Sequence, residues 1–491
     1  MKQFFILPAI FLISIVGFCQ QDPDTVSKPP EVLEEVLVRA VRVDADSPVT
    51  HSNIDKKELG KRNLGQDLPF MLNYLPSVVS TSDAGAGVGY TSFRVRGSDA
   101  SRINVTLNGI PFNDAESQGS FFVNLPDFTS SVQNLQLQRG VGTSTNGSGA
   151  FGASLNLLTD AVSEEVFGEI SNSFGSFNTR RHNLKFSTGL LNNRVEIAGR
   201  LSAIASDGYI DRASSNLKSY FLQAAYIDDN TLIKAIAFGG HEVTYQSWNG
   251  IDKETLEEDR TFNSAGMFTD AQGNIRFHDN EVDDYKQDHY QLHWNQRFNN
   301  KWSSNLGLNY TYGRGFFEQY RENDRFSTYG FEPLEVAGET INMTDLIRRR
   351  WLDNDFYVIN ANVTYKNNTL EVTSGAFYSH YKGDHFGEVI WARFASDSEF
   401  GDRYYFSDAS KDEFTVFSKA TWRINNQWQL FADLQGRFIN YKTAGITSDV
   451  VPIDVNENFG FFNPKMGVTY QIDESNQLFA YFGRAHREPT R

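Results

Sequence analysis

The strongest constraint in this chain is a two-residue alternation of apolar and polar side chains that recurs from about residue 165 to residue 491. Residues 288–294 illustrate it, and residues 194–203, 302–312 and 357–365 repeat it. In the first stretch one face carries Tyr290, Leu292 and Trp294, and the other carries His289, Gln291 and His293. Because successive side chains of a strand point to opposite faces, the pattern predicts strands with one apolar and one polar face.

Short and long connections alternate between these strands. The short ones are centred on pairs of turn-forming residues, mostly Asn, which tolerates a positive φ. They are Asn192-Asn193, Asp229-Asn230, Asn299-Asn300, Asn367-Asn368, Asn425-Asn426 and Glu474-Ser475. The long ones are polar and lie near residues 247–285, 316–350, 384–411 and 442–461. This sorting is typical of a transmembrane antiparallel β-barrel, with short turns on one side of the membrane and long loops on the other.

A soluble β-sandwich is the alternative fold, but it would bury its apolar faces and would rarely sort its connections in this way. In a membrane barrel the apolar face meets lipid and the polar face lines the lumen. Trp302, Trp428, Tyr310 and Tyr312 are then expected in the aromatic belts at the two membrane interfaces.

The number of strands also bears on how much of a barrel is present. Six turn-linked pairs and one opening strand predict about 13 strands in residues 161–491, whereas plugged barrels use about 22. The chain ends at Arg487-Glu488-Pro489-Thr490-Arg491 and not in an aromatic-terminated strand. We therefore expect residues 161–491 to be the N-terminal portion of a larger barrel, whether the truncation is natural or reflects an incomplete sequence.

Composition excludes several classes of protein. A mean hydropathy of −0.44 excludes a polytopic helical membrane protein but suits a barrel, in which only alternate residues face lipid. A net charge of −16 argues against a nucleic-acid partner, which requires a basic face. The single Cys excludes a disulfide framework and a multi-cysteine metal site. No paired carboxylates, Ser/His/Asp set or nucleophile elbow indicates an enzyme, and no cofactor is expected.

Residues 1–19 are predicted to be a signal peptide, because a positive start precedes an apolar stretch from Phe4 to Phe18. The alternative is that Cys19 becomes a lipidated N-terminus. Residues 20–43 begin polar and contain several Pro, which predicts a flexible extension. The run in it is either the first strand of the next domain or a strand that docks on a partner's sheet edge. This run consists of Glu34, Glu35, Val36, Leu37 and Val38.

Residues 44–160 are predicted to form a small α+β domain with Gly-rich loops. Leu and Met at helical spacing in residues 65–75 predict a helix that ends before Pro76. Alternation predicts strands over residues 93–97, 103–107 and 135–139, and Asn108-Gly109 is typical of a tight turn. The two long loops of the domain cover residues 81–92 and 113–120.

Four segments of this domain resemble the plug of TonB-dependent outer-membrane receptors. They are Leu68–Val79, Phe93–Gly97, Asn104–Pro111 and Leu137–Thr159, of which the last is the most specific. The glycines of these motifs are Gly97, Gly109, Gly140, Gly149 and Gly152. The run at residues 34–38 resembles a TonB box in the form common in Bacteroidetes. Asn108 departs from the family, which usually has Asp at that position.

The resemblance implies a plug inside the lumen of a barrel in the outer membrane of a Gram-negative cell. It implies that a TonB partner, energised at the inner membrane, pairs with residues 34–38 and moves the plug. It also implies that Arg96 and Arg139 contact barrel carboxylates, although the simpler alternative places both on solvated strand ends.

The relatives that the plug resembles imply active import of a ferric chelate, such as a siderophore or an iron-citrate-like complex. Tyr90, Asp114, Glu116 and Gln118 in the upper plug loops are the expected ligand contacts, and ordinary loop solvation is their alternative. Import of a glycan or of cobalamin is a second possibility, and a passive pore or surface adhesin is a third. No metal site is predicted, because hydrogen-bonded lumen residues are the expected role of the paired His289 and His293.

Overall fold

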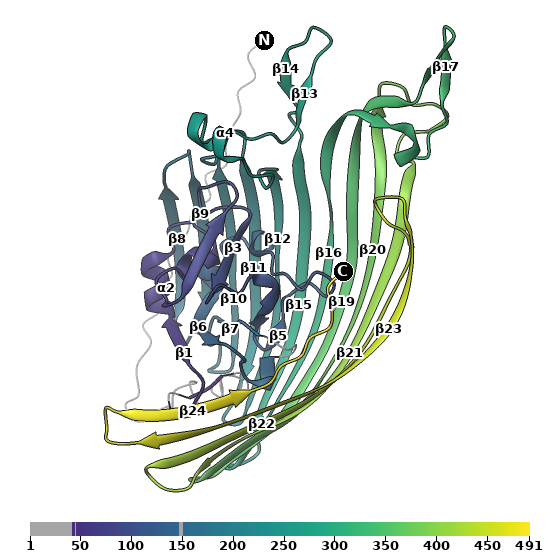
Figure 1. Cartoon of the computed structure of the whole chain (residues 1–491). Coiled ribbons are helices and arrows are strands. Elements are labelled where there is room, and N and C mark those ends of the chain that lie inside the picture. The colour runs from purple at the N-terminus through teal and green to yellow at the C-terminus, as the bar shows by residue number, and fades with distance from the viewer. Residues whose placement is uncertain (1–41, 45, 147–150) are drawn as a thin grey trace, which may run out of the picture.

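The computed structural model of the chain describes residues 42–44, 46–146 and 151–491. It shows a small N-terminal domain, the plug, on the concave side of one large curved sheet, the wall (Figure 1). The predicted signal peptide with Cys19, the run at residues 34–38 and Gly149 lie outside the described residues.

The wall is a single antiparallel sheet of 13 strands in which sequence neighbours pair throughout, from β8 at one edge to β24 at the other. The strands are β8 (Val166–Phe174), β9 (Arg180–Thr188), β10 (Val195–Ser206), β11 (Ser215–Ile227), β12 (Thr231–Tyr245), β15 (Val282–Arg297), β16 (Trp302–Arg325), β19 (Met343–Lys366), β20 (Leu370–Ala392), β21 (Arg403–Arg423), β22 (Trp428–Ile446), β23 (Pro452–Gln471) and β24 (Gln477–Gly483). Each of the six predicted tight turns joins two of these strands. The predicted fold class and strand number are confirmed.

The two faces of the wall differ in polarity as the alternation predicts. On β15, His293 is 1% exposed and its neighbour Trp294 is 40% exposed. Arg437 and Asp433 are fully buried on the concave side of β22, whereas Phe438 is 57% exposed on the other side. The wall therefore turns its polar side chains inward and its apolar side chains outward, the reverse of a soluble sheet.

The strands are longer than the alternation predicts. Strands β16 and β19 have 24 residues each and β20 has 23, whereas a tilted strand crosses a bilayer in about 9–11 residues. The connections expected at 316–350, 384–411 and 442–461 shrink to residues 326–342, 393–402 and 447–451, so their predicted extent is wrong. Beyond the hydrocarbon layer both faces of a strand can be polar, so alternation ends before backbone pairing ends.

The two longest connections, residues 246–281 and 326–342, fold into small elements that project beyond the wall at the top of Figure 1. They contain α4 (Lys253–Glu258), β13 (Met267–Thr269), β14 (Ile275–Phe277), η5 (Phe326–Thr328), β17 (Leu334–Val336) and β18 (Glu339–Ile341). None of the helices in residues 42–44, 46–146 and 151–491 has the length and hydropathy of a membrane-spanning helix.

Aromatic pairs mark two levels of the wall. Near the short turns, the ring centroids of Trp302 and Tyr365 are 4.9 Å apart. Towards the long connections, Tyr310 stacks between Tyr290 and Tyr357, at 6.1 and 4.9 Å. The two levels on β16 are separated by roughly the strand length that crosses a bilayer core, which fits the predicted aromatic belts.

The plug is built on a five-stranded sheet of order β1-β6-β7-β4-β5, with a separate β2–β3 hairpin. Among the described strands, only β4 and β7 pair in parallel. Its elements are β1 (His51–Asp55), α2 (Lys56–Arg62), α3 (Leu68–Met71), β2 (Val78–Ser82), β3 (Thr91–Val95), η1 (Ala100–Arg102), β4 (Ile103–Leu107), β5 (Ile110–Pro111), η2 (Phe122–Asn124), η3 (Phe128–Ser131), β6 (Val132–Arg139), η4 (Ser144–Asn146) and β7 (Ala153–Thr159).

The plug helices differ from the prediction. The helix expected over residues 65–75 is reduced to the four residues of α3, because Gly65 adopts a φ of 116° and the chain turns after Met71 to reach β2. The sequence pattern missed α2, which is held by local signals. Asp55 accepts from the Glu58 amide at its start, and Arg62 pairs with Glu58 at 2.6 Å.

The plug core is apolar and continues into the wall. Phe221, Ile236 and Phe238 point inward from β11 and β12 and join the plug's buried cluster. The ring centroids of Phe128 and Phe238 are 5.2 Å apart. A smaller cluster joins Ile110 of the plug to Val358 and Phe377 on another part of the wall, so both apolar and polar contacts seat the plug.

Candidate functional site

A cavity of about 470 Å³ opens where the plug meets the wall, on the side of the long connections. Plug residues 111–117 form one side of the cavity. Residues of five wall strands, β15, β16, β19, β20 and β21, form the other side. Three of the four predicted ligand residues, Tyr90, Asp114 and Glu116, line this cavity. The fourth, Gln118, lies in a small adjoining pocket.

Tyr90 reaches the cavity from the Gly-rich loop at residues 81–92. Gly89 in this loop has a φ of 92°, and a Cβ there would collide with Ser215 of β11. The loop therefore lies directly against the wall, which allows the Tyr90 hydroxyl to donate to Asp283. Burial, together with the carboxylates of Glu242 and Asp283, raises the pKa of Tyr90 well above its usual value, so the hydroxyl stays a donor.

Asp114 rigidifies the loop that carries the other predicted contacts. Its Oδ1 accepts from the Ser117 amide and the Ser117 hydroxyl, both at 2.7 Å. The preceding Asn113 side chain donates to Ile103 O at 2.8 Å and to Gln118 O at 2.9 Å. The carboxylate of Asp114 thus serves the local turn, although its side chain lines the cavity.

Glu116 is the junction between this plug loop and the wall. It accepts from Tyr381 at 2.9 Å and from Tyr441 at 2.8 Å, and its carboxylate lies 2.7 Å from His385. Arg491 completes the set at 3.1 Å. Burial opposes ionisation of Glu116, but His385 with Tyr441 and Arg491 outweighs it and lowers the pKa to about 2. Glu116 is therefore a carboxylate at neutral pH.

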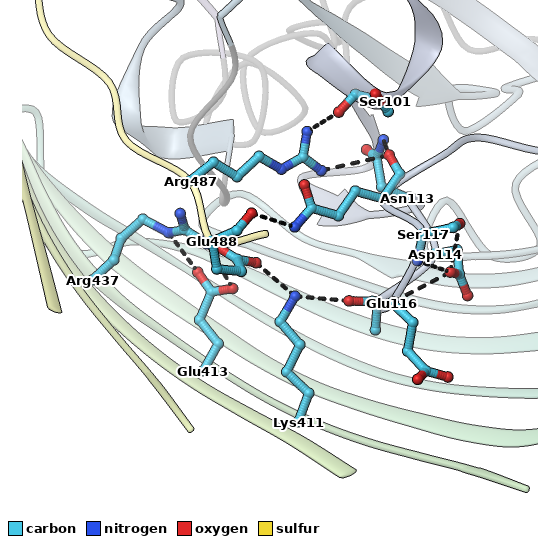
Figure 2. Close-up of polar contacts among 12 residues, drawn as sticks. Ser101, Asn113, Asp114, Glu116, Ser117, Lys411, Glu413, Arg437, Arg487 and Glu488 are labelled. Atoms are coloured by element: carbon cyan, nitrogen blue, oxygen red, sulfur yellow. Dashed lines mark hydrogen bonds and ion pairs between the residues drawn. The ribbon is translucent and has the colours of Figure 1, made fainter. Parts of the chain in front are cut away.

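Residues 484–491 form a second contact with the plug, which the sequence analysis missed. After β24 they run along the inner face of the wall (Figure 1). Lys411 donates to Glu488 at 2.6 Å and to Ala115 O at 2.7 Å, so it joins this segment to the plug loop (Figure 2). Arg437 donates to Glu488 at 3.2 Å, and Gln118 donates to the Glu488 carbonyl at 3.1 Å.

Two buried ion pairs between plug and wall also went unpredicted. Asp127 of the plug lies 3.0 Å from Arg181 and 3.5 Å from Arg200, both on the inner face of the wall. Ser202 donates to the same carboxylate at 2.6 Å. Burial opposes ionisation of Asp127, but Arg200 and Arg181 lower its pKa. The sequence signal that could have indicated these pairs is the presence of arginines on the predicted polar faces of the strands, because a buried guanidinium group requires an anionic partner.

The two arginines predicted to hold the plug lie elsewhere. Arg139 is buried and donates to Pro76 O at 3.1 Å and to Ser52 at 3.0 Å, both within the plug. Arg96 is exposed in the turn after β3. Neither contacts a wall carboxylate among the described residues, so their role as plug–barrel contacts remains a prediction.

Three of the motif glycines and Asn108 belong to tight turns. Gly97, Gly109 and Gly140 have φ values near 80°, and a Cβ at Gly152 would collide with Ser98. Asn108 donates to Gln291 of β15 at 3.0 Å and accepts from the Thr159 amide at 2.9 Å. An aspartate could not make the first bond, which explains why an amide suits this position.

His289 and His293 lie on the inner face of β15, where each has one hydrogen-bond partner. His289 is 2.9 Å from the Thr311 hydroxyl, and His293 is 3.1 Å from the Gln291 amide oxygen. Within the part of the chain that the structure describes, no cluster of three or more His, Cys, Asp or Glu side chains is suited to a metal ion.

Family models match both parts of the chain. Residues 43–154 match the TonB-dependent receptor plug domain, and residues 225–491 match the TonB-dependent receptor-like β-barrel. No curated protein sequence matches the chain.

Solved structures share the fold at low sequence identity. The ferric-catecholate import receptor Fiu from E. coli K12, in its open form, has a TM-score of 0.67 at 14% identity, over 91% of this chain and 71% of that one. The ferric citrate transporter FecA gives 0.66 at 14% identity, over 89% and 62%. The copper transporter OprC gives 0.67 at 14% identity, over 89% and 64%.

The chain thus spans between 62% and 71% of the length of these three structures. At such identities the likeness establishes the fold alone. The names of the three proteins also refer to different transported substances: ferric catecholate, ferric citrate and copper. The family models cover most of the chain and describe receptors of the outer membrane, not enzymes. This chain therefore belongs to the TonB-dependent receptor family.

Proposed function

We propose that this receptor imports a ferric chelate, such as a siderophore or an iron-citrate-like complex, across the outer membrane. The observation that carries the proposal is the cavity above the plug. It lies between the plug loop at residues 111–117 and the wall, in the part of β15, β16 and β19 nearer the long connections. A chelate entering from outside would meet this cavity first.

The contacts of Glu116 supply the step from binding to transport. One carboxylate of the plug loop is shared by Tyr381, His385, Tyr441 and Arg491, and it lines the cavity. A cargo that competes for these partners would loosen the plug loop from the wall. Binding at the cavity would then be coupled to release of the plug, because the cargo and Glu116 compete for the same side chains.

Energy would come from the inner membrane through TonB. Residues 34–38 are proposed as the strand that TonB captures, and residues 1–19 as the signal peptide that directs export. The two iron receptors of the same fold support a ferric cargo, since their names describe ferric-catecholate import and ferric citrate transport.

The test is uptake of radiolabelled ferric chelates by cells that carry the receptor, with and without Val36→Pro. Proline removes a strand donor and should block pairing with TonB without affecting the barrel. We expect uptake to be lost while binding at the cell surface persists. Val26→Pro, the same change ten residues earlier, is the matched control and should leave uptake intact.

Absence of iron uptake in every strain would overturn the ferric proposal and favour a glycan or cobalamin. Uptake that is insensitive to Val36→Pro would instead contradict the proposed TonB strand and favour a passive pore.

A further inference from the structure

We infer that the cavity selects ferric chelates that carry both aromatic rings and negative charge. The inference rests on the proposed function and narrows its cargo from ferric chelates in general to anionic aryl chelates. Two features of the cavity carry it: one charged side chain that forms no hydrogen bond or ion pair with a described residue, and rings that lie against the wall.

The charge is that of Arg350. Besides two histidines, the charged side chains that line the cavity are Asp114, Glu116, Asp283, Arg350 and Arg491. Four of them are already engaged. Asp114 caps its own loop, Asp283 accepts from Tyr90, and Glu116 pairs with Arg491.

The guanidinium of Arg350 forms no hydrogen bond or ion pair with any residue that the structure describes, and its Nε is buried without a partner. A buried donor without an acceptor is costly, and a ligand anion would satisfy it. The free charge that the cavity offers to its cargo is therefore positive, although the protein as a whole carries −16.

The rings are those of Tyr285, Tyr381 and Tyr405. Each lies where the wall has a glycine on its inner face, because a Cβ at Gly313, Gly383 or Gly387 would collide with the respective ring. The missing side chains let the rings lie across the wall. Asn354 donates to the Tyr285 hydroxyl at 3.0 Å, and Tyr381 donates to Glu116, so two of the three rings are also fixed at their tips. Fixed rings against a wall present their faces to the cavity and suit stacking with a planar aromatic group.

The strand register places the charge between rings. Phe317 of β16 pairs with Arg350 of β19, Arg350 pairs with Gly387 of β20, and Gly387 pairs with Tyr405 of β21. The Arg350 guanidinium lies 5.9 Å from the Phe317 ring centre. An aryl chelate could place its rings on Phe317 and Tyr405 and its charge on Arg350 at once. Citrate offers only the charge, and a cationic hydroxamate complex offers neither.

The test is equilibrium binding of three radiolabelled ferric complexes to the purified receptor in detergent. The ligands are dihydroxybenzoyl-serine, which is aromatic and anionic in its complex, citrate, which is anionic only, and desferrioxamine B, whose complex is cationic. We expect the dihydroxybenzoyl-serine complex to bind at least about tenfold more tightly than the other two, since each tenfold corresponds to one good contact.

Two substitutions separate the two features. Arg350→Gln should weaken the aryl complex and ferric citrate by about tenfold each and leave ferrioxamine B unchanged, because only the anions use the charge. Tyr405→Leu should weaken the aryl complex alone. Arg403→Gln is the matched control for charge. Arg403 is exposed at the start of β21, two residues before Tyr405, and does not line the cavity. Tyr405→Phe, which keeps the ring, is the control for stacking.

Heat-modifiable migration on gels shows whether each variant is folded, and the ranking of the three complexes on the unaltered receptor tests the inference without any variant. Equal affinity for ferric citrate and the aryl complex would overturn aromatic selection while leaving iron import in place. Tightest binding of ferrioxamine B would overturn selection by charge. Binding of none of the three complexes, with retention of maltoheptaose instead, would overturn the proposed function itself.

Discussion

The plug and the wall use the same two-residue periodicity in opposite ways. In the plug strand β3, Phe93 and Val95 are buried in an apolar core, and Arg94 between them is exposed. In the wall, Leu201 is 56% exposed and Arg437 is fully buried. The periodicity of a strand thus separates apolar from polar side chains, but the medium on each side decides which set is buried.

The difference dictates how the two parts meet. Because the wall turns polar side chains inward, the plug must present polar groups that pair with them, as Asp127 and Glu116 do. Where the wall instead points Phe221 and Phe238 inward, the plug extends its own apolar core to them. The boundary is therefore held by buried ion pairs and by several apolar contacts.

The largest effect is expected at the ionic boundary. Asp127→Asn leaves Arg181 and Arg200 buried without their counter-charge, which should cost about 3–5 kcal/mol in the local stability of the docked plug. Hydrogen exchange of residues 122–131 measures this opening free energy. The control is Asp99→Asn, which breaks a 2.6 Å pair with Arg102 that is half exposed and should cost about 1 kcal/mol or less. Equal effects of the two substitutions would refute the ionic boundary.

The next largest effect is expected when a leucine of the plug core is shortened to alanine, in comparison with a leucine on the outer face of the wall. Leu155→Ala should cost about 2–5 kcal/mol, because it opens a cavity in the plug core. Leu306→Ala should cost little, because lipid fills the space on the outer face of β16. Hydrogen exchange of the plug and thermal unfolding of the barrel in micelles report the two losses separately. A large loss from Leu306→Ala would show that this face packs against protein and not lipid.

A charge on the outer face should have a similar but slightly smaller effect. Leu306 lies on β16 between Trp302 and Tyr310, the two aromatic levels. An arginine near the bilayer midplane costs a barrel about 2–4 kcal/mol. We expect Leu306→Arg to reduce folding into lipid vesicles, measured as the heat-modifiable fraction, while Leu306→Ala folds normally. Normal folding of Leu306→Arg would place the membrane at another level of the wall.

Two tyrosines on β20 sharpen the comparison of its faces. Tyr381 faces the plug and donates to the buried Glu116 at 2.9 Å, whereas Tyr378 faces outward and donates to Asp412 at 2.8 Å. Tyr381→Phe should cost about 1–3 kcal/mol, because it removes a donor from a buried carboxylate, and Tyr378→Phe about 1 kcal/mol or less. Protection of residues 113–118 from hydrogen exchange is the measurement. If both variants leave it unchanged, Glu116 does not hold the loop.

The smallest effect is a dependence on pH. Burial opposes ionisation of Glu488, but Arg437 and Lys411 lower its pKa to about 2, and Glu116 has a similar value. Because both values lie below the ordinary 4.5, their contribution to docking of residues 484–491 is present above about pH 4.5 and is lost as the pH falls towards 2. Hydrogen exchange of this segment should follow that window, and Glu116→Gln should reduce the dependence. A loss of protection already near neutral pH would contradict these pKa values.

Most of the fold was predictable because its signals are local. The six tight turns, the 13 strands and the inward and outward faces follow from turn residues and from alternation, which one strand and its neighbours determine. The extent of β16, β19 and β20 was not predictable, because backbone pairing continues where the alternation fades. The plug helices were misjudged for a related reason, since α3 is cut short by the path to β2 and α2 depends on one cap.

The site divides in the same way. The motif loops of the plug singled out Tyr90, Asp114 and Glu116, and the fold brings all three to one cavity. The partners of Glu116 are between 265 and 375 residues away in the chain, so no local pattern indicates them. Asp127 with its two arginines, and Lys411 with Glu488, were missed for the same reason.

The sequence by itself determined a barrel wall with a polar inner face, a plug with turn glycines at fixed places, and the family resemblance that both carry. Those properties depend on residues that are close in the chain, where periodicity and φ preferences act. Only the tertiary structure decided which charges meet across the boundary, and it left Arg350 without a hydrogen bond or ion pair among the described residues that line the cavity. Ion pairing and cavity shape depend on distances between strands that are far apart in sequence, and these distances exist only once the wall has curved around the plug.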